Sequence, residues 1–81
     1  MYDIYVLKSQ NSEHYYVGQT DDLNKRLIRH NSGLEYWTKR YRPWILIYKE
    51  SYKTRQEAVQ REKYLKSHVG RNWLKKTIKP L

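Results

Sequence analysis

The chain has 81 residues, with 17 Lys and Arg against 8 Asp and Glu, and it contains no cysteine. This length allows one domain with a thin core, because a chain of this size buries only about 60% of its unfolded surface. The net charge of +9 favours a polyanionic partner, nucleic acid ahead of an anionic membrane. The absence of cysteine excludes disulfides, thiolate metal sites and cysteine nucleophiles.

The N-terminus lacks the basic start and apolar run of a signal peptide, and no stretch approaches the roughly 20 apolar residues of a membrane span. We therefore expect a single cytoplasmic domain over residues 1–81 that has no membrane partner.

Alternating residues over 2–8 and 14–19 predict two strands joined by a hairpin. If the tip lies at residues 10–11, Tyr5 stands opposite Tyr16 and the two share a face. A loop longer by one residue would separate them. The core-like face would carry Ile4, Val6, Tyr15 and Val17, and the polar face, which could bear a site, would carry Asp3, Tyr5, His14, Tyr16 and Gly18.

A helix is predicted over residues 21–31, with Leu23 and Leu27 forming its apolar stripe. Arg26 and His30 are four residues apart and share a face at the edge of this stripe. We expect both side chains to be neither buried nor fully solvated. The helix can be capped by Thr20, Asp21 or Asp22 and can end at Asn31-Ser32-Gly33.

Residues 34–43 form a basic loop rich in aromatic rings, which suits either nucleic-acid binding or a patch over a small core. Residues 44–50 follow as a near-continuous apolar run, which predicts a strand covered on both faces.

A capping box at Thr54 and Glu57 predicts the start of a helix over residues 54–69, closed by Gly70. On this helix Glu62 interrupts an apolar stripe, and a carboxylate facing a core requires a cation. That cation could be a metal, Arg26 or a lysine. A last helix is predicted over 72–78, with Asn72 as its N-cap. The stripe comprises Ala58, Glu62, Leu65 and Val69.

The predicted fold class is therefore α/β. A small, mainly antiparallel three-stranded sheet (2–8, 14–19, 44–50) is flanked by helices near 21–31, 54–69 and 72–78.

Two short motifs, Ile4-Tyr5-Val6 and Tyr16-Val17-Gly18, precede a long and specific run that continues through Arg26 and His30 to Gly33. Together with the segment around Glu62, these residues resemble the GIY-YIG nuclease family, most closely its small standalone members. The resemblance covers about residues 2–76. It implies metal-assisted hydrolysis of a phosphodiester, with Mg²⁺ or Mn²⁺ as the cofactor.

The resemblance also implies roles for single residues. Tyr5 and Tyr16 match the motif tyrosines, one of which helps to deprotonate the attacking water. Arg26 matches the arginine that holds the scissile phosphate, and Glu62 the carboxylate that binds the divalent ion. His30 lies where members have a His or Tyr near the nucleophile or leaving group.

Asn72 lies where some members have a supporting Asn. Asp3 departs from the first motif's glycine, and Gln19 stands where some members carry a Lys that lowers a tyrosine pKa.

The expected partner is nucleic acid, DNA ahead of RNA, with a possible partner protein for targeting. The alternative is a non-catalytic DNA- or RNA-binding module that retains the fold. Cations expected to contact nucleic acid are Lys25, Arg29, Lys39 and Arg40.

Overall fold

The computed structural model of the protein describes residues 1–78, so the last three residues of the expected domain 1–81 lie outside it. None of the helices in this described part is long and apolar enough to cross a membrane. In chain order its elements are β1 (Tyr2–Ser9), β2 (Tyr15–Thr20), α1 (Leu23–Asn31), the 3-10 helix η1 (Thr38–Tyr41), β3 (Trp44–Tyr52), α2 (Arg55–Lys66) and α3 (His68–Thr77).

The strands form an antiparallel sheet in the order β2-β1-β3, which confirms the predicted α/β class. The prediction that 44–50 is covered on both faces is wrong. The hairpin places β2 on one side of β1, so β3 pairs with the other side and becomes an edge strand. Its Ile45 and Leu46 are 37% and 38% exposed. The strand buried on both faces is β1, through the consecutive residues Ile4, Tyr5, Val6 and Leu7.

The hairpin register differs from the predicted one by two residues. Tyr5 pairs with Gly18, and Tyr16 pairs with Leu7. The longer turn is closed by a hydrogen bond from the Ser9 backbone N–H to the His14 carbonyl, 3.0 Å long. Because side chains alternate with a period of two, this shift leaves Tyr5 and Tyr16 on the same face, as predicted.

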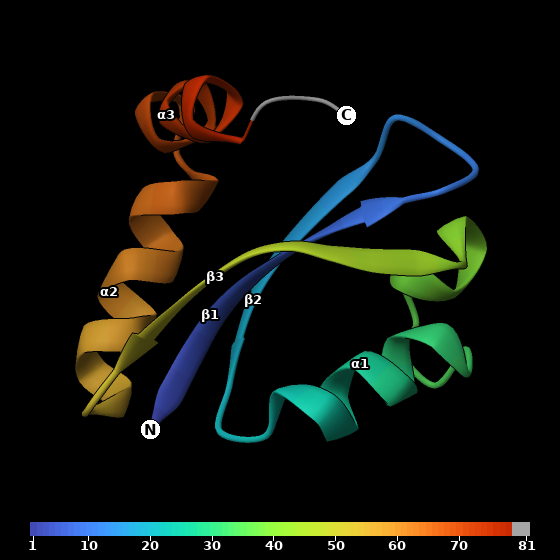
Figure 1. Cartoon of the computed structure of the whole chain (residues 1–81), viewed down its shortest axis with the longest axis horizontal. Coiled ribbons are helices and arrows are strands. Elements are labelled where there is room, and N and C mark those ends of the chain that lie inside the picture. The colour runs from blue at the N-terminus through green and yellow to red at the C-terminus, as the bar shows by residue number, and fades with distance from the viewer. Residues whose placement is uncertain (79–81) are drawn as a thin grey trace.

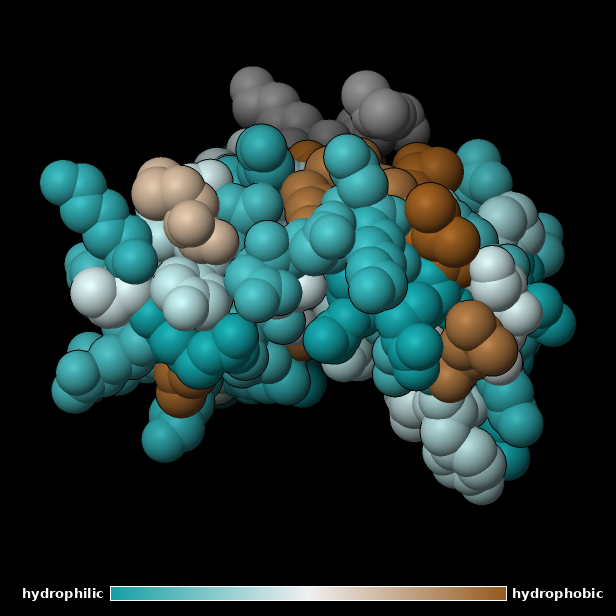
Figure 2. All heavy atoms as spheres, turned by 90° about the horizontal axis from the view of Figure 1, so that it is seen from below, coloured by the Kyte–Doolittle hydropathy of each residue, from teal (hydrophilic) through white to brown (hydrophobic). Residues whose placement is uncertain are grey.

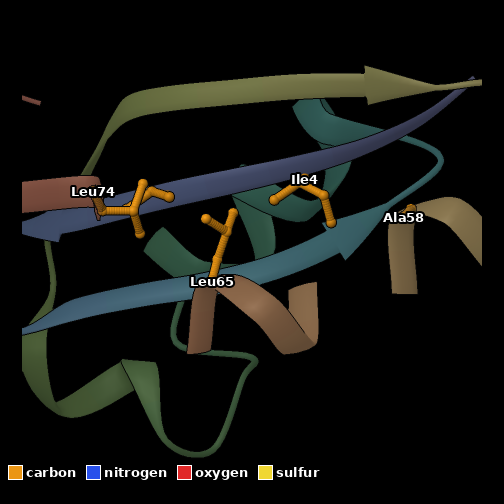
Figure 3. Packing of buried hydrophobic residues seen from close by; sticks show 5 residues of the cluster. Ile4, Ala58, Leu65 and Leu74 are labelled. Carbon is orange, nitrogen blue, oxygen red and sulfur yellow. The ribbon is translucent and has the colours of Figure 1, made fainter. Parts of the chain in front are cut away.

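Helices cover both faces of the sheet (Figure 1), so the face expected to be polar is also core. On one face α1 packs against the cluster of Tyr5, Leu7 and Trp44. On the other face α2 and α3 enclose a second cluster, in which Leu65 of α2 is directed at the sheet beside Ile4 (Figure 3). The second cluster consists of Ile4, Val6, Ala58, Leu65 and Leu74.

Two helix starts follow their predicted caps. Asp22 accepts from the Lys25 backbone N–H at 3.1 Å and caps α1. Thr54 accepts from the Glu57 backbone N–H at 3.2 Å and begins α2. After α1, the chain turns at Gly33, whose φ of +79° is the left-handed conformation that favours glycine.

The predicted helix over 54–69 is instead two helices. Ser67 breaks it: its hydroxyl donates to the Tyr64 carbonyl and accepts from the Gly70 backbone N–H. Ser67, not Asn72, is therefore the N-cap of α3, and Val69 is 63% exposed. Gly70 lies inside α3, where an added Cβ would stand 1.9 Å from the Tyr64 carbonyl oxygen. The glycine permits the close approach of α3 to the end of α2.

Candidate active site

Tyr5, Tyr16 and His30 meet between the sheet and α1. Adjacent strands place Tyr5 and Tyr16 with ring centroids 6.1 Å apart, and the last turn of α1 brings the His30 ring to 4.8 Å from that of Tyr16. The Tyr5 hydroxyl and His30 Nε2 are joined by a hydrogen bond of 2.9 Å. The structure therefore brings together three of the predicted site residues.

These residues differ in depth. Tyr5 is fully buried and His30 is 1% exposed, whereas Tyr16 and Arg26 are half-buried. Arg26 is as predicted, but the prediction of a half-solvated His30 is wrong. The loop after α1 folds back over it, and Thr38 of η1 contacts its second ring nitrogen. Tyr16 and Arg26 are thus the members of the group that an incoming molecule can reach.

Gly18 completes this geometry. A Cβ added there would lie 2.6 Å from the Tyr5 hydroxyl oxygen and 2.9 Å from Cε2 of Tyr16. Any side chain at this position would displace the tyrosines, because Cβ atoms in proteins essentially never approach other heavy atoms within 3.0 Å. The glycine of the second motif is required by the aromatic pair beneath it.

Burial sets the charge states of the cluster. Burial, followed by the neighbouring Tyr16, raises the pKa of the Tyr5 hydroxyl well above its ordinary value, although the adjacent Arg26 opposes the shift. Burial also lowers the pKa of His30; Glu35 opposes this shift, while Arg26 and Arg29 add to it. At neutral pH Tyr5 is therefore protonated and His30 is a neutral imidazole.

Thr38 is a part of this network that the sequence did not indicate. Its hydroxyl lies 2.8 Å from His30 Nδ1, and its carbonyl accepts a hydrogen bond of 2.8 Å from the Trp44 indole. Asn31 then holds the backbone of Trp44 through two hydrogen bonds, of 2.6 and 3.1 Å. Only the fold, which brings η1 onto α1, reveals the pairing of Thr38 with His30.

Glu62 lies on α2, across the sheet from α1. Its carboxylate accepts from Lys66 Nζ at 3.0 Å, so a lysine is the cation among the three alternatives. Lys66 Nζ also lies 6.0 Å from the centroid of the Tyr16 ring. This lysine therefore lies between the Glu62 carboxylate and Tyr16 of the edge strand β2.

The donor set at Glu62 suits a hard divalent ion that keeps most of its water. Among residues 1–78, no three His, Asp or Glu side chains are grouped to hold a metal. A zinc-type site is therefore absent from this part of the chain. One carboxylate, 20% exposed, suits Mg²⁺, which proteins commonly bind through one or two carboxylates, water and substrate phosphate.

Asn72 is exposed on α3, and its side-chain nitrogen lies 3.3 Å from His68 Nε2. Its side chain therefore contacts His68 of the same helix, and the structure does not bring it to Tyr5 and Tyr16. Lys25 and Arg29, with Arg26, line a small pocket of about 220 Å³ at the start of α1, although Arg29 also pairs with Glu35 at 2.7 Å.

Lys39 and Arg40 are exposed on η1, and Lys39 Nζ lies 5.1 Å from the ring centroid of Tyr36. On the side of the molecule seen from below in Figure 2, hydrophilic residues cover most of the surface.

A groove of about 620 Å³ extends from Tyr16 along β2 to α3. Aromatic and cationic side chains line it together with apolar ones, and rings combined with cations suit bases and phosphates. Arg71 and Lys75 of α3 contribute here, although nothing in the sequence pattern singles them out. The rings and cations that line the groove are His14, Tyr15, Tyr16, Trp37, Lys66, Arg71 and Lys75.

Comparison with known proteins supports the same family. The family model of the GIY-YIG catalytic domain matches residues 1–76. A UPF0213 protein from Staphylococcus epidermidis is 38% identical over 73 residues, which are 89% of this chain and 88% of that protein. The UPF0213 protein YazA from Bacillus subtilis is 44% identical over 63 residues, which are 76% of this chain and 63% of that protein.

The solution structure of the UPF0213 protein BH0048 from Bacillus halodurans has a TM-score of 0.57 to this chain. The match covers 94% of this chain and 83% of that one, at 24% identity, and it shows a shared fold. The chain belongs to the GIY-YIG family, and its relatives are the small standalone members called UPF0213 proteins.

Proposed function

We propose that this protein is a divalent-metal-dependent endonuclease that hydrolyses phosphodiester bonds in nucleic acid, DNA ahead of RNA. GIY-YIG domains are generally nucleases. The observation that carries the proposal is the meeting of Tyr5, Tyr16 and His30, from β1, β2 and α1, beside the half-buried Arg26. Tyr16, the half-buried tyrosine of this group, also lines the groove that extends to α3.

We assign the phosphate to Arg26, because a guanidinium keeps its proton and its planar fork matches two phosphate oxygens. Its half-buried position strengthens the interaction relative to a fully solvated cation. Tyr16 is the reachable tyrosine, and we assign it, as the phenolate, to orient the attacking water and accept its proton. The water oxygen then bonds to phosphorus as the P–O bond to the leaving group breaks, and the leaving oxygen takes a proton from solvent. Tyr5 and His30, which are buried, hold these two side chains.

We assign the divalent ion to Glu62. Mg²⁺ or Mn²⁺ bound there would supply positive charge against the phosphate and the leaving oxygen. Lys66 occupies the carboxylate in the structure, so binding of the ion requires that the exposed Lys66 side chain swing aside. An exposed lysine can do this at small cost, since such ion pairs contribute only about 0.3–0.5 kcal/mol.

Nucleic acid is the proposed partner, and the groove and the exposed cations on α1, η1 and α3 support this assignment. The binding set comprises Lys25, Arg29, Lys39 and Arg40, extended by Arg71 and Lys75. A partner protein that directs the enzyme to its target remains part of the proposal.

The ion pair between Glu62 and Lys66 favours a second candidate function, a binding module without catalysis. In such a module the carboxylate serves the helix alone. Both functions predict salt-dependent binding of nucleic acid, and only the first predicts cleavage.

The test is incubation of the pure protein with single-stranded, duplex and branched DNA in the presence of magnesium. The wild type should cut at least one substrate, and Arg26→Ala should lower the rate by about 10²–10³. Lys53→Ala, which removes an exposed cation that lines neither the groove nor the pocket beside Arg26, is the matched control and should retain the wild-type rate. Binding without cleavage in every case would leave the non-catalytic module as the function.

A further inference from the structure

Thr38 has an unusual position for a threonine in a basic surface loop. It begins η1 and is 1% exposed, in contact with the buried end of α1. Its hydroxyl makes a side-chain hydrogen bond with His30 Nδ1, 2.8 Å long. Its own carbonyl is held by the Trp44 indole. The residue is therefore fixed from two sides, with its hydroxyl aimed at the imidazole.

The hydroxyls of Thr38 and Tyr5 contact opposite nitrogens of the same ring, at 2.8 and 2.9 Å. A neutral imidazole has one N–H and one acceptor nitrogen, so it donates to one hydroxyl and accepts from the other. The three groups can therefore be ordered in either of two directions. In each direction one hydroxyl at an end of the row keeps a proton without a partner among the three.

The surroundings of the two ends decide the direction. The Thr38 end is closed by the buried Trp44. The Tyr5 end adjoins Tyr16 and Arg26, which are both half-buried, and the Tyr16 hydroxyl oxygen is an acceptor. A buried donor without an acceptor costs about 1–3 kcal/mol, so the spare proton belongs at the polar end.

We propose that Thr38 is a positioning residue that donates its hydroxyl proton to His30 Nδ1. It thereby holds His30 as the Nε2–H tautomer and directs the Tyr5 proton toward the Tyr16 oxygen, since Arg26 can only donate. The ordering of the row is independent of activity, whereas its consequence for cleavage rests on the proposed function. Thr38 does not contact the substrate. It acts through His30 and Tyr5 on the two groups that do.

The ordering gives His30 a defined task. Its Nε2–H donates to the Tyr5 oxygen, so His30 does not take a proton from Tyr5. If Tyr16 acts as a phenolate, its oxygen carries negative charge until it takes the proton of the water, and Tyr5 offers a hydrogen-bond donor to that oxygen. A donor fixed in advance lowers the free energy of that state without reorganisation during the reaction.

The first measurement is the ¹⁵N shift of both ring nitrogens of His30, from long-range ¹H–¹⁵N NMR spectra at neutral pH. We expect Nε2 to carry the proton in the wild type and in Thr38→Ser, which keeps a hydroxyl. Thr38→Val has the same shape without a donor, and its shifts should move toward values averaged over both tautomers. A wild-type His30 protonated at Nδ1 would overturn the proposal, whether or not the protein cleaves DNA.

The second measurement is cleavage. Thr38→Val should lower kcat by about 10- to 100-fold with little change in KM, as loss of an orienting partner typically does. Thr38→Ser should restore most of the rate. Ser9→Ala is the matched control, because it removes the 2.7 Å hydrogen bond to the Tyr41 carbonyl and loosens η1 without touching His30. Equal losses in Thr38→Val and Ser9→Ala, or no rescue by serine, would show a merely structural role and overturn the proposal.

Discussion

The Tyr5 hydroxyl lies 2.9 Å from Nε2 of His30, although the two residues are 25 positions apart in the chain. Their contact joins the central strand to the last turn of α1 inside a fully buried cluster. The two tyrosines of the motif are consequently unequal, since Tyr16 is half-buried and Tyr5 is not reachable.

This inequality predicts different results for two similar substitutions. Tyr16→Phe should abolish most cleavage while the free energy of unfolding changes little, because its hydroxyl is assigned to the water. Tyr5→Phe should lower the free energy of unfolding by about 1–3 kcal/mol, because a buried His30 nitrogen loses its partner. Tyr5→Phe should lose less cleavage activity than Tyr16→Phe does. Urea unfolding and single-turnover cleavage measure the two effects, and the reverse order would contradict the assignment.

Alanine substitutions at Gly18 and Gly70 distinguish effects on the candidate active site from effects on the stability of the fold. Gly18→Ala places a methyl group 2.6 Å from the Tyr5 hydroxyl oxygen. It should lower the free energy of unfolding by about 1–3 kcal/mol and should also lower the cleavage activity. Gly70→Ala should destabilise the protein more, because its Cβ meets the rigid backbone of Tyr64 at 1.9 Å. At a temperature where each variant is folded, Gly70→Ala should retain its specific activity and Gly18→Ala should not. Equal specific activities would show that Gly18 is structural only.

Glu50 predicts an acid-sensitive step in stability. Its carboxylate accepts from Tyr48 at 2.5 Å, from Tyr52 at 2.6 Å and from Arg61 at 2.8 and 3.0 Å. Burial opposes ionisation, but the hydrogen bonds from Arg61, Tyr48 and Tyr52 outweigh it and lower the pKa of Glu50 to about 2. A depressed pKa means that the unfolded state binds the proton more readily than the folded state does.

The stabilisation is therefore complete above the unfolded pKa of about 4.5 and is lost as the pH falls toward about 2. It should amount to roughly 2–3 kcal/mol. Urea unfolding of Glu50→Gln at pH 7 should show this loss, and much of the dependence on pH between 5 and 2 should disappear. Glu13→Gln, at an exposed carboxylate, is the control. An unchanged acid transition in Glu50→Gln would contradict the prediction.

The groove predicts a change in salt dependence. If Arg71 and Lys75 each neutralise one phosphate, each alanine substitution should lower the slope of log Kd against log salt by about 0.7–0.9. Fluorescence anisotropy over a range of salt concentrations measures the slope. Lys49→Ala, an exposed cation on the edge strand, serves as the control. Slopes that stay the same in both groove variants would place the nucleic acid elsewhere.

Local chemistry explains which parts of the fold were predictable. Asp22 and Thr54 cap their helices through contacts within three residues, so the sequence alone indicates them. The helix break at Ser67 is not predictable from the apolar stripe, because the stripe continues to Val69. The break depends on the Ser67 hydroxyl, which bonds to the backbone of Tyr64 and Gly70. The edge position of β3 depends on the order of strands, which periodicity does not specify.

The same distinction applies to the site. The spacing of Arg26 and His30 indicated a shared helix face, but the burial of His30 depends on Thr38, eight positions further along the chain, in a loop that the sequence left open. Arg71 and Lys75 face the groove only because α3 turns at Ser67. The catalytic and metal-binding roles of Tyr5, Tyr16, Arg26, His30 and Glu62 remain predictions.

The most direct test of the central claim is DNA cleavage by wild type and Glu62→Gln as magnesium is titrated, with EDTA as the zero point. Lys66→Met is the matched variant, since it breaks the same 3.0 Å ion pair and leaves the carboxylate. We predict cleavage that requires the ion, is lost in Glu62→Gln and keeps its dependence on magnesium in Lys66→Met. Cleavage that is equal in Glu62→Gln and wild type, or that is absent from the wild type at every concentration, would contradict the claim.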